Sequence, residues 1–232
     1  MYIKNRIFAL VFRVIALILS IAGVIAISIN GGVFSFKSWL FYTLMSNLVV
    51  VIYFIVVVFL TLKDLIKEGV EGSTSYFPKI AMILSVDILL TLLVFWILLA
   101  PTSFDMGSDF KLLSFANISV HTITPILMII DFLLLNKRRA LKFSDIFLVM
   151  IFPYSYMALS FILGFSGYVY MISNGENIYF PYFFLDIYNN GWMVLVYVLA
   201  LTIVFWGVGM LCYLFDRKAS DKEIYLRRAK TK

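Results

Sequence analysis

Long apolar runs separated by short polar segments make up most of this chain. Six runs each approach the roughly 20 residues that a helix needs to cross a bilayer. They cover residues 7–29, 38–62, 78–100, 113–135, 145–167 and 191–215. The shorter segments of alternating polarity that are typical of a membrane β-barrel are missing. The pattern therefore predicts an all-α polytopic membrane protein whose six transmembrane helices form a single domain, residues 1–232.

The composition agrees with this class. Hydrophobic residues make up 63% of the chain and charged residues 14%, and the mean hydropathy is +1.01, outside the usual range of a soluble domain. One cysteine, Cys212, and one histidine, His121, are present. An intramolecular disulfide and a zinc site of nitrogen and sulfur ligands are therefore excluded. We expect no metal and no cofactor.

Basic residues mark the two sides of the predicted bundle. Of the 19 lysines and arginines, all but Lys37, Lys111 and Arg13 fall in the terminal segments or in connections that alternate to the same side. By the positive-inside rule both termini are cytoplasmic, and residues 216–232 form a basic cytoplasmic tail. The net charge of +6 then fits contact with membrane lipids and no binding of nucleic acid. No pattern indicates an oligomeric state, and we expect the protein in a bacterial cytoplasmic membrane.

Polar residues inside the apolar runs form two groups by depth, the first in the outer half. Counted from the helix ends, Thr43 and His121 lie at similar depth, roughly 8–12 Å below the outer surface. Asn47 follows Thr43 by one turn, and Asn117 precedes His121 by one turn, each on the same helix face. An ionisable side chain inside a lipid-embedded helix is costly, so His121 is a candidate functional residue.

Thr43 and His121 have the residue types of a nucleophile and its base. A threonine hydroxyl needs an adjacent base to attack a carbonyl, and a neutral imidazole is the usual one. Asn47 or Asn117 could donate to an oxyanion. Pro125 lacks an N–H, so we expect a kink that leaves the carbonyl of residue 121 free. From spacing alone, a structural role for these polar groups is favoured over catalysis.

The second group, Arg13, Asp87 and Asp131, lies in the inner half. A lone charge at such depth is costly, so Arg13 is expected to pair with Asp87 or Asp131. The cluster could be a structural ion pair that fixes helix register, or part of a proton or ion pathway. Asp131 follows His121 by ten residues, about 15 Å along one helix, and is too far away to orient the imidazole.

The outer connection, residues 168–190, is rich in aromatic residues. Such residues are typical of the membrane–water interface. Long connections are also often functional, so a lid over an acyl-chain pocket is the alternative. In that case Tyr182, Phe183 and Asp186 are the candidate pocket residues.

Four segments, in order from the second to the sixth run, resemble a known family. They are FYTLMSNL (41–48), HTITP (121–125) followed by Asp131, Phe152-Pro153 with Tyr156, and YFPYFFLD (179–186) before Gly191. The set is similar to the androgen-induced protein family, which includes the androgen-dependent regulator of tissue factor pathway inhibitor and bacterial six-span relatives. The chain departs from the animal members at Ser46, where they have a carboxylate, and at Pro125, which falls one residue earlier.

The resemblance implies an integral-membrane threonine hydrolase that cleaves fatty acid esters of hydroxy fatty acids. The family's nucleophile falls on Thr43 and its essential histidine on His121, with Ser46 in the supporting shell. The expected substrate is a lipid ester that enters from the bilayer. Two other functions remain open. One is a small transporter or channel that uses Arg13, Asp87 and Asp131, and the other is a catalytically silent lipid-binding protein.

Overall fold

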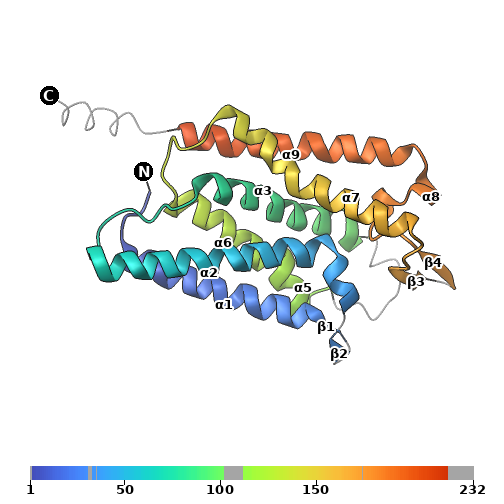
Figure 1. Ribbon diagram of the computed structural model, residues 1–232, viewed down its shortest axis with the longest axis horizontal. Helices are drawn as coiled ribbons and strands as arrows, with labels where there is room; N and C mark the ends of the chain where they lie inside the picture. The colour runs from blue at the N-terminus through green and yellow to red at the C-terminus, as the bar shows by residue number, and fades with distance from the viewer. Residues whose placement is uncertain (1, 31–32, 35, 102–111, 174, 219–232) are drawn as a thin grey trace.

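The computed structural model describes residues 2–30, 33–34, 36–101, 112–173 and 175–218. Within these ranges six helices are long and apolar enough to cross a membrane, which confirms the predicted fold class at this level and fits a multi-pass membrane protein. They run side by side as an elongated bundle (Figure 1). The six spans are Arg6–Ser28, Tyr42–Glu68, Pro78–Leu99, Phe115–Leu135, Phe143–Phe165 and Met193–Arg217.

The second span differs most from its predicted range of 38–62. Phe36–Leu40 forms a separate 3₁₀ helix, η1, and α2 covers Tyr42–Glu68. Phe41 has extended backbone and sets the start of α2, while Gly69, at φ +84°, ends it. A positive φ suits glycine because it has no Cβ. Thr43 is therefore the second residue of α2, closer to the helix end than its predicted place five residues inside.

Helices α1 (Arg6–Ser28) and α2 pack along each other, and α3 (Pro78–Val94) packs on α2. The main apolar core is formed by α2, α3 and the middle of the fourth span, with Phe54, Met82, Ile88 and Met128 fully buried. The last helix, α9 (Met193–Arg217), packs on α3 and on η5 (Phe143–Met150). Residues 216 and 217, predicted to begin the tail, are the last turn of α9; residues 219–232 lie outside the described part of the chain.

Two spans are interrupted by π-helical turns. One is η2 (Phe95–Leu99), which continues α3. The fourth span consists of α5 (Phe115–Ile118), η3 (Ser119–Ile123), α6 (Thr124–Ile130) and η4 (Asp131–Leu135), of which η3 and η4 are π-helical. Pro125, from which a kink was predicted, lies in the first turn of α6 directly after η3, in which the Thr124 N–H donates to the Ser119 carbonyl. Such turns are frequent at functional sites.

The connection between the last two spans has its own structure. It follows α7 (Ile151–Phe165) and contains a hairpin of β3 (Met171–Ser173) with β4 (Glu176–Ile178). It continues through η6 (Phe183–Leu185) and α8 (Ile187–Asn190). A second small hairpin, β1 (Ile29–Asn30) with β2 (Val33–Phe34), follows α1. Both hairpins lie at the end of the bundle where α2 begins (Figure 1).

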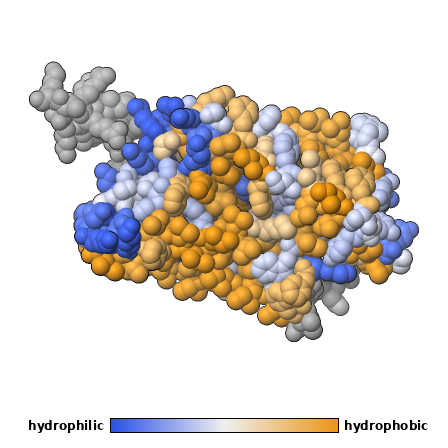
Figure 2. All heavy atoms as spheres, in the orientation of Figure 1, coloured by the Kyte–Doolittle hydropathy of each residue, from blue (hydrophilic) through white to orange (hydrophobic). Residues whose placement is uncertain are grey.

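The surface matches this arrangement. Apolar residues cover much of the visible flank of the bundle, and hydrophilic residues gather toward its two ends (Figure 2). The start of α1 and the end of α9 lie at the same end, as an even number of spans requires (Figure 1). Large apolar side chains remain exposed along the flanks of α1 and α9, among them Ile18, Leu195 and Ile203. An apolar flank is the face that suits contact with lipid acyl chains.

Candidate functional site

A cavity lies between α2, α3, α7 and α9, beside the segment that links α7 to α9. It encloses about 710 Å³ of space, counting its open side. Most of its walls are apolar, and this lining suits a hydrocarbon chain. The lining residues are Tyr42, Thr43, Leu90, Thr91, Val94, Phe95, Leu99, His121, Met150, Pro153, Tyr154, Tyr156, Met157, Tyr182, Phe184, Leu185, Val198, Leu201, Thr202 and Phe205.

Both residues of the predicted dyad line this cavity. Thr43 is partly buried in the first turn of α2, and His121 is buried in the middle of η3. The two are 78 positions apart in the sequence. Their side chains form no direct hydrogen bond in this structure, and in an unliganded site such contacts are often longer than in the substrate complex.

Phe95 fixes the plane of the His121 ring. The two rings stack with their centroids 3.7 Å apart and their planes 8° from parallel. The imidazole is also within hydrogen-bonding reach of the Thr91 backbone carbonyl, one turn before Phe95. A neutral imidazole carries one donor and one acceptor nitrogen. Donation to Thr91 would therefore leave the other nitrogen as an acceptor. No sequence signal identifies Phe95, because one aromatic residue in an apolar run resembles any core residue.

Tyr182 is the residue of the outer connection that approaches Thr43. Its hydroxyl is within hydrogen-bonding reach of the Thr43 side chain and of the Tyr42 and Thr43 backbone. The Tyr42 and Thr43 N–H groups belong to the first turn of α2, whose N-cap residue Phe41 supplies no side-chain acceptor. Burial raises the pKa of Tyr182 to about 12, although these hydrogen bonds lower it. The phenol is therefore protonated and a donor at neutral pH.

The three predicted supporting residues do not line the cavity. The Asn47 amide nitrogen donates to the carbonyls of Thr43 (2.8 Å) and Val120 (3.1 Å) and so ties α2 to η3. The Ser46 hydroxyl donates to the Thr43 carbonyl and contacts the Thr91 hydroxyl at 3.2 Å. Asn117 is buried in α5, which packs on α1. Asn47 and Ser46 therefore connect helices around the cavity, whereas Asn117 lies away from it.

Of the three pocket residues predicted in the connection, only Tyr182 lines the cavity. Phe183 is 46% exposed, and Phe184 and Leu185 line the cavity in its place. Asp186 caps α8 by accepting from the Tyr188 and Asn189 backbone N–H groups. This cap fixes the end of η6, which places Phe184 and Leu185. Periodicity does not identify the inward residue of such a short turn.

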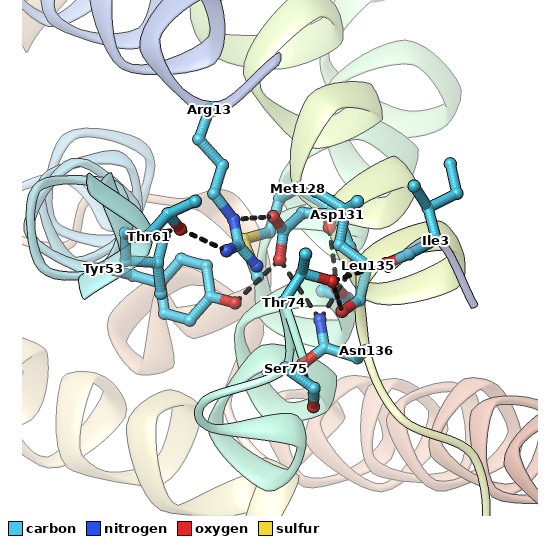
Figure 3. A network of polar contacts seen from close by, with 12 residues as sticks. Ile3, Arg13, Tyr53, Thr61, Thr74, Ser75, Met128, Asp131, Leu135 and Asn136 are labelled. Carbon is cyan, nitrogen blue, oxygen red and sulfur yellow. Dashed lines mark hydrogen bonds and ion pairs between the residues drawn. The ribbon is translucent and has the colours of Figure 1, made fainter. Parts of the chain in front are cut away.

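The expected ion pair joins Arg13 to Asp131 (Figure 3). Arg13 Nε lies 2.7 Å from Asp131 Oδ1, and both side chains are fully buried. The other carboxylate oxygen accepts from the hydroxyl of Tyr53, at 2.7 Å, and from Asn136 Nδ2. Arg13 Nη1 donates to the Thr61 hydroxyl. The network connects α1, α2 and η4 and gives each carboxylate oxygen a donor, as a structural ion pair requires.

Asp87 does not belong to that network, although the three charges were predicted to form one cluster. Its side chain is 1% exposed, and neither carboxyl oxygen has a hydrogen-bond partner. It lines a second cavity between α2, α3 and the fifth span. By residue counting, Asp87 and Asp131 were both candidate salt-bridge partners of Arg13. Which of the two pairs with Arg13 depends on the direction in which each side chain leaves its helix.

Comparison with models of protein families, with curated proteins and with solved structures finds no match to this chain.

Proposed function

We propose that the protein is an intramembrane lipid ester hydrolase in which Thr43 is the nucleophile and His121 the base. One observation carries the proposal. A hydroxyl and an imidazole from different helices line the same cavity, whose other walls are mostly apolar. Such a cavity accommodates a substrate with a hydrocarbon body and one polar reacting group. The resemblance of the four segments to a family of membrane threonine hydrolases selects the same two residues.

The proposed reaction is acyl transfer through a covalent intermediate. His121 takes the proton of the Thr43 hydroxyl as Oγ1 attacks the ester carbonyl carbon. The tetrahedral intermediate collapses, and the departing alkoxide takes the proton from the imidazolium and leaves as an alcohol. Water then attacks the acyl-threonine with His121 as base, which frees the fatty acid and regenerates the threonine hydroxyl. The steps consume one water for each ester and need no metal or cofactor.

Tyr182 is the proposed oxyanion donor, in place of the asparagines considered from the sequence. Its hydroxyl lies beside Thr43, and the N–H groups of the first turn of α2 are close to it. A protonated phenol and a helix N-terminus both favour negative charge, so an oxyanion formed at Thr43 would find both donors nearby.

The proposed substrates are fatty acid esters of hydroxy fatty acids, taken directly from the membrane. Residues from α7 and α9 form one side of the cavity, where the Tyr154 and Thr202 hydroxyls lie 3.0 Å apart. The ester would enter sideways from the outer leaflet, where its acyl chains already reside. The distribution of lysine and arginine orients both termini to the cytoplasm and the site to the outer half of the bilayer, in a bacterial cytoplasmic membrane.

Covalent labelling tests the nucleophile directly. A fluorophosphonate probe added to the protein in neutral detergent is expected to form an adduct on Thr43, located by mass spectrometry of proteolytic fragments. The Thr43→Ala variant should lose the adduct, because only an activated hydroxyl reacts. Thr124→Ala is the matched control, since Thr124 is a buried threonine of the fourth span that does not line the cavity. Labelling that persists in Thr43→Ala would refute the assignment.

The oxyanion role of Tyr182 predicts a change in kcat. Tyr182→Phe should lower kcat for ester hydrolysis by about 10²-fold with little change in KM, because a donor that acts mainly in the transition state is lost. Tyr188→Phe is the control, since Tyr188 lies in the same connection, is 58% exposed and does not line the cavity. A Tyr182→Phe variant with the parent kcat would exclude the role.

A further inference from the structure

The second cavity contains an acid that no described residue neutralises. Asp87 is 1% exposed, and both of its carboxyl oxygens lack a partner. A buried carboxylate without a counter-ion is strongly destabilised, and a protonated carboxyl without hydrogen bonds is also costly. Native proteins rarely leave such a group unsatisfied without a functional reason. The Asp87 carboxyl group therefore needs a hydrogen-bonding or charged partner from outside the described residues.

A cavity with an open side lies beside Asp87. It encloses about 520 Å³ of space, counting that side. Seven of its nine lining residues are apolar, and the other two are Asp87 and Ser46. The lining residues are Ser46, Val49, Val50, Ile83, Leu84, Asp87, Leu148, Ile151 and Phe152.

The basic residues that form salt bridges among the described residues pair with other acids. Arg13 pairs with Asp131, Arg6 with Glu68, and Lys79 with Asp145. Among the described residues, no salt bridge includes Asp87. The site therefore presents a negative or proton-bearing group, an apolar body and no resident cation. Charge complementarity selects a ligand that brings its own positive charge and hydrogen-bond donors.

We propose that this cavity binds the head of a single-chain primary amine, with the ammonium paired to Asp87 and the alkyl chain along the apolar walls. A primary ammonium offers three donors, which can satisfy both carboxyl oxygens. The apolar walls suit the methylene groups next to the nitrogen. The remainder of a long chain would extend through the open side between the helices. The proposal does not depend on the hydrolase assignment.

The amine site is separate from the cavity of Thr43 and His121 but adjoins it. Ser46 lines the second cavity and Thr91 the first. Their hydroxyls lie 3.2 Å apart and join α2 to α3 between the two spaces. Asp87 is one turn from Thr91 on α3, and its carbonyl accepts from the Thr91 hydroxyl. An amine at Asp87 therefore occupies space that the ester site does not use.

Dodecylamine, which is cationic at neutral pH, is the probe for this site. Binding is measured on the full chain in a neutral maltoside detergent, by calorimetry and by the rise in the thermal unfolding midpoint. The parent protein is expected to bind dodecylamine, and Asp87→Asn to bind it about 30-fold more weakly or worse. Dodecan-1-ol, which has the same chain without the charge, should give no comparable stabilisation.

Two further variants test the charge of Asp87 and the space of the cavity separately. Asp64→Asn removes one acid from the same helix bundle, where Asp64 accepts from the Tyr76 hydroxyl, and should bind the amine as the parent does. Val49→Phe fills the cavity without changing charge and should weaken binding even if Asp87→Asn does not fold. Equal stabilisation by the alcohol, or undiminished amine affinity in Asp87→Asn or in Val49→Phe, would overturn the proposal.

Discussion

Thr43→Ala and His121→Ala are each expected to reduce the hydrolysis of a fatty acid ester of a hydroxy fatty acid by at least about 10³-fold. Thr43→Ala removes the atom that carries the acyl group, and His121→Ala removes the base that activates it. Thr43→Ser keeps a hydroxyl at the same position and should retain measurable activity. Released fatty acid, measured by mass spectrometry from mixed micelles, gives the rates.

The double variant separates a catalytic pair from two unrelated structural effects. Residues that act as one unit are strongly non-additive, so the combined variant should be about as inactive as either single variant. Size-exclusion profiles and thermal unfolding midpoints close to those of the parent would show that folding is retained. A single variant that turns over ester at the parent rate would remove that residue from the mechanism.

Asp131→Leu is expected to destabilise the bundle by about 3 to 5 kcal/mol. The substitution leaves Arg13 charged, fully buried and without its carboxylate, and also leaves the Tyr53 hydroxyl without its acceptor. The variant should show a lowered unfolding midpoint or a loss of monodisperse protein in detergent. Thermal unfolding followed by circular dichroism measures the change.

Removing both charges gives the matched comparison. Arg13→Met combined with Asp131→Leu should recover most of the lost stability, because no unpaired charge remains in the interior. Lys79→Ala breaks an ion pair in which the lysine side chain is 48% exposed. That variant should cost no more than about 1 kcal/mol. If Asp131→Leu is as stable as the parent protein, the buried pair does not hold these helices together.

The helices were predictable because crossing a bilayer imposes a length and an apolar composition that local sequence records. Their ends were less predictable where apolar residues continue past the helix. Residues 38–40 belong to the predicted run but form part of η1, and α2 begins only after the extended Phe41. Because α2 begins four residues later than predicted, Thr43 lies in its first turn. The backbone N–H groups of that turn are therefore part of the site.

Within the candidate site, residue types were predictable and partners were not. His121 and Thr43 stood out because a polar group inside a membrane helix is costly, and both line the first cavity. The stacking of His121 on Phe95 depends on where η2 meets η3 in space. The choice of Asp131 over Asp87 for Arg13 depends on helix rotation. Sequence spacing along one helix contains no information about the rotation of another.

The sequence by itself determined the number of helices, their approximate ranges and the polar residues that need an explanation, because each follows from hydrophobicity along a single chain. Only the tertiary structure decided which of those residues meet. Packing brought Tyr182 to Thr43, turned Asn47 to the carbonyl of Val120 and left Asp87 in a cavity of its own. These outcomes depend on distances between helices and on their rotations, which arise only when all six spans pack together.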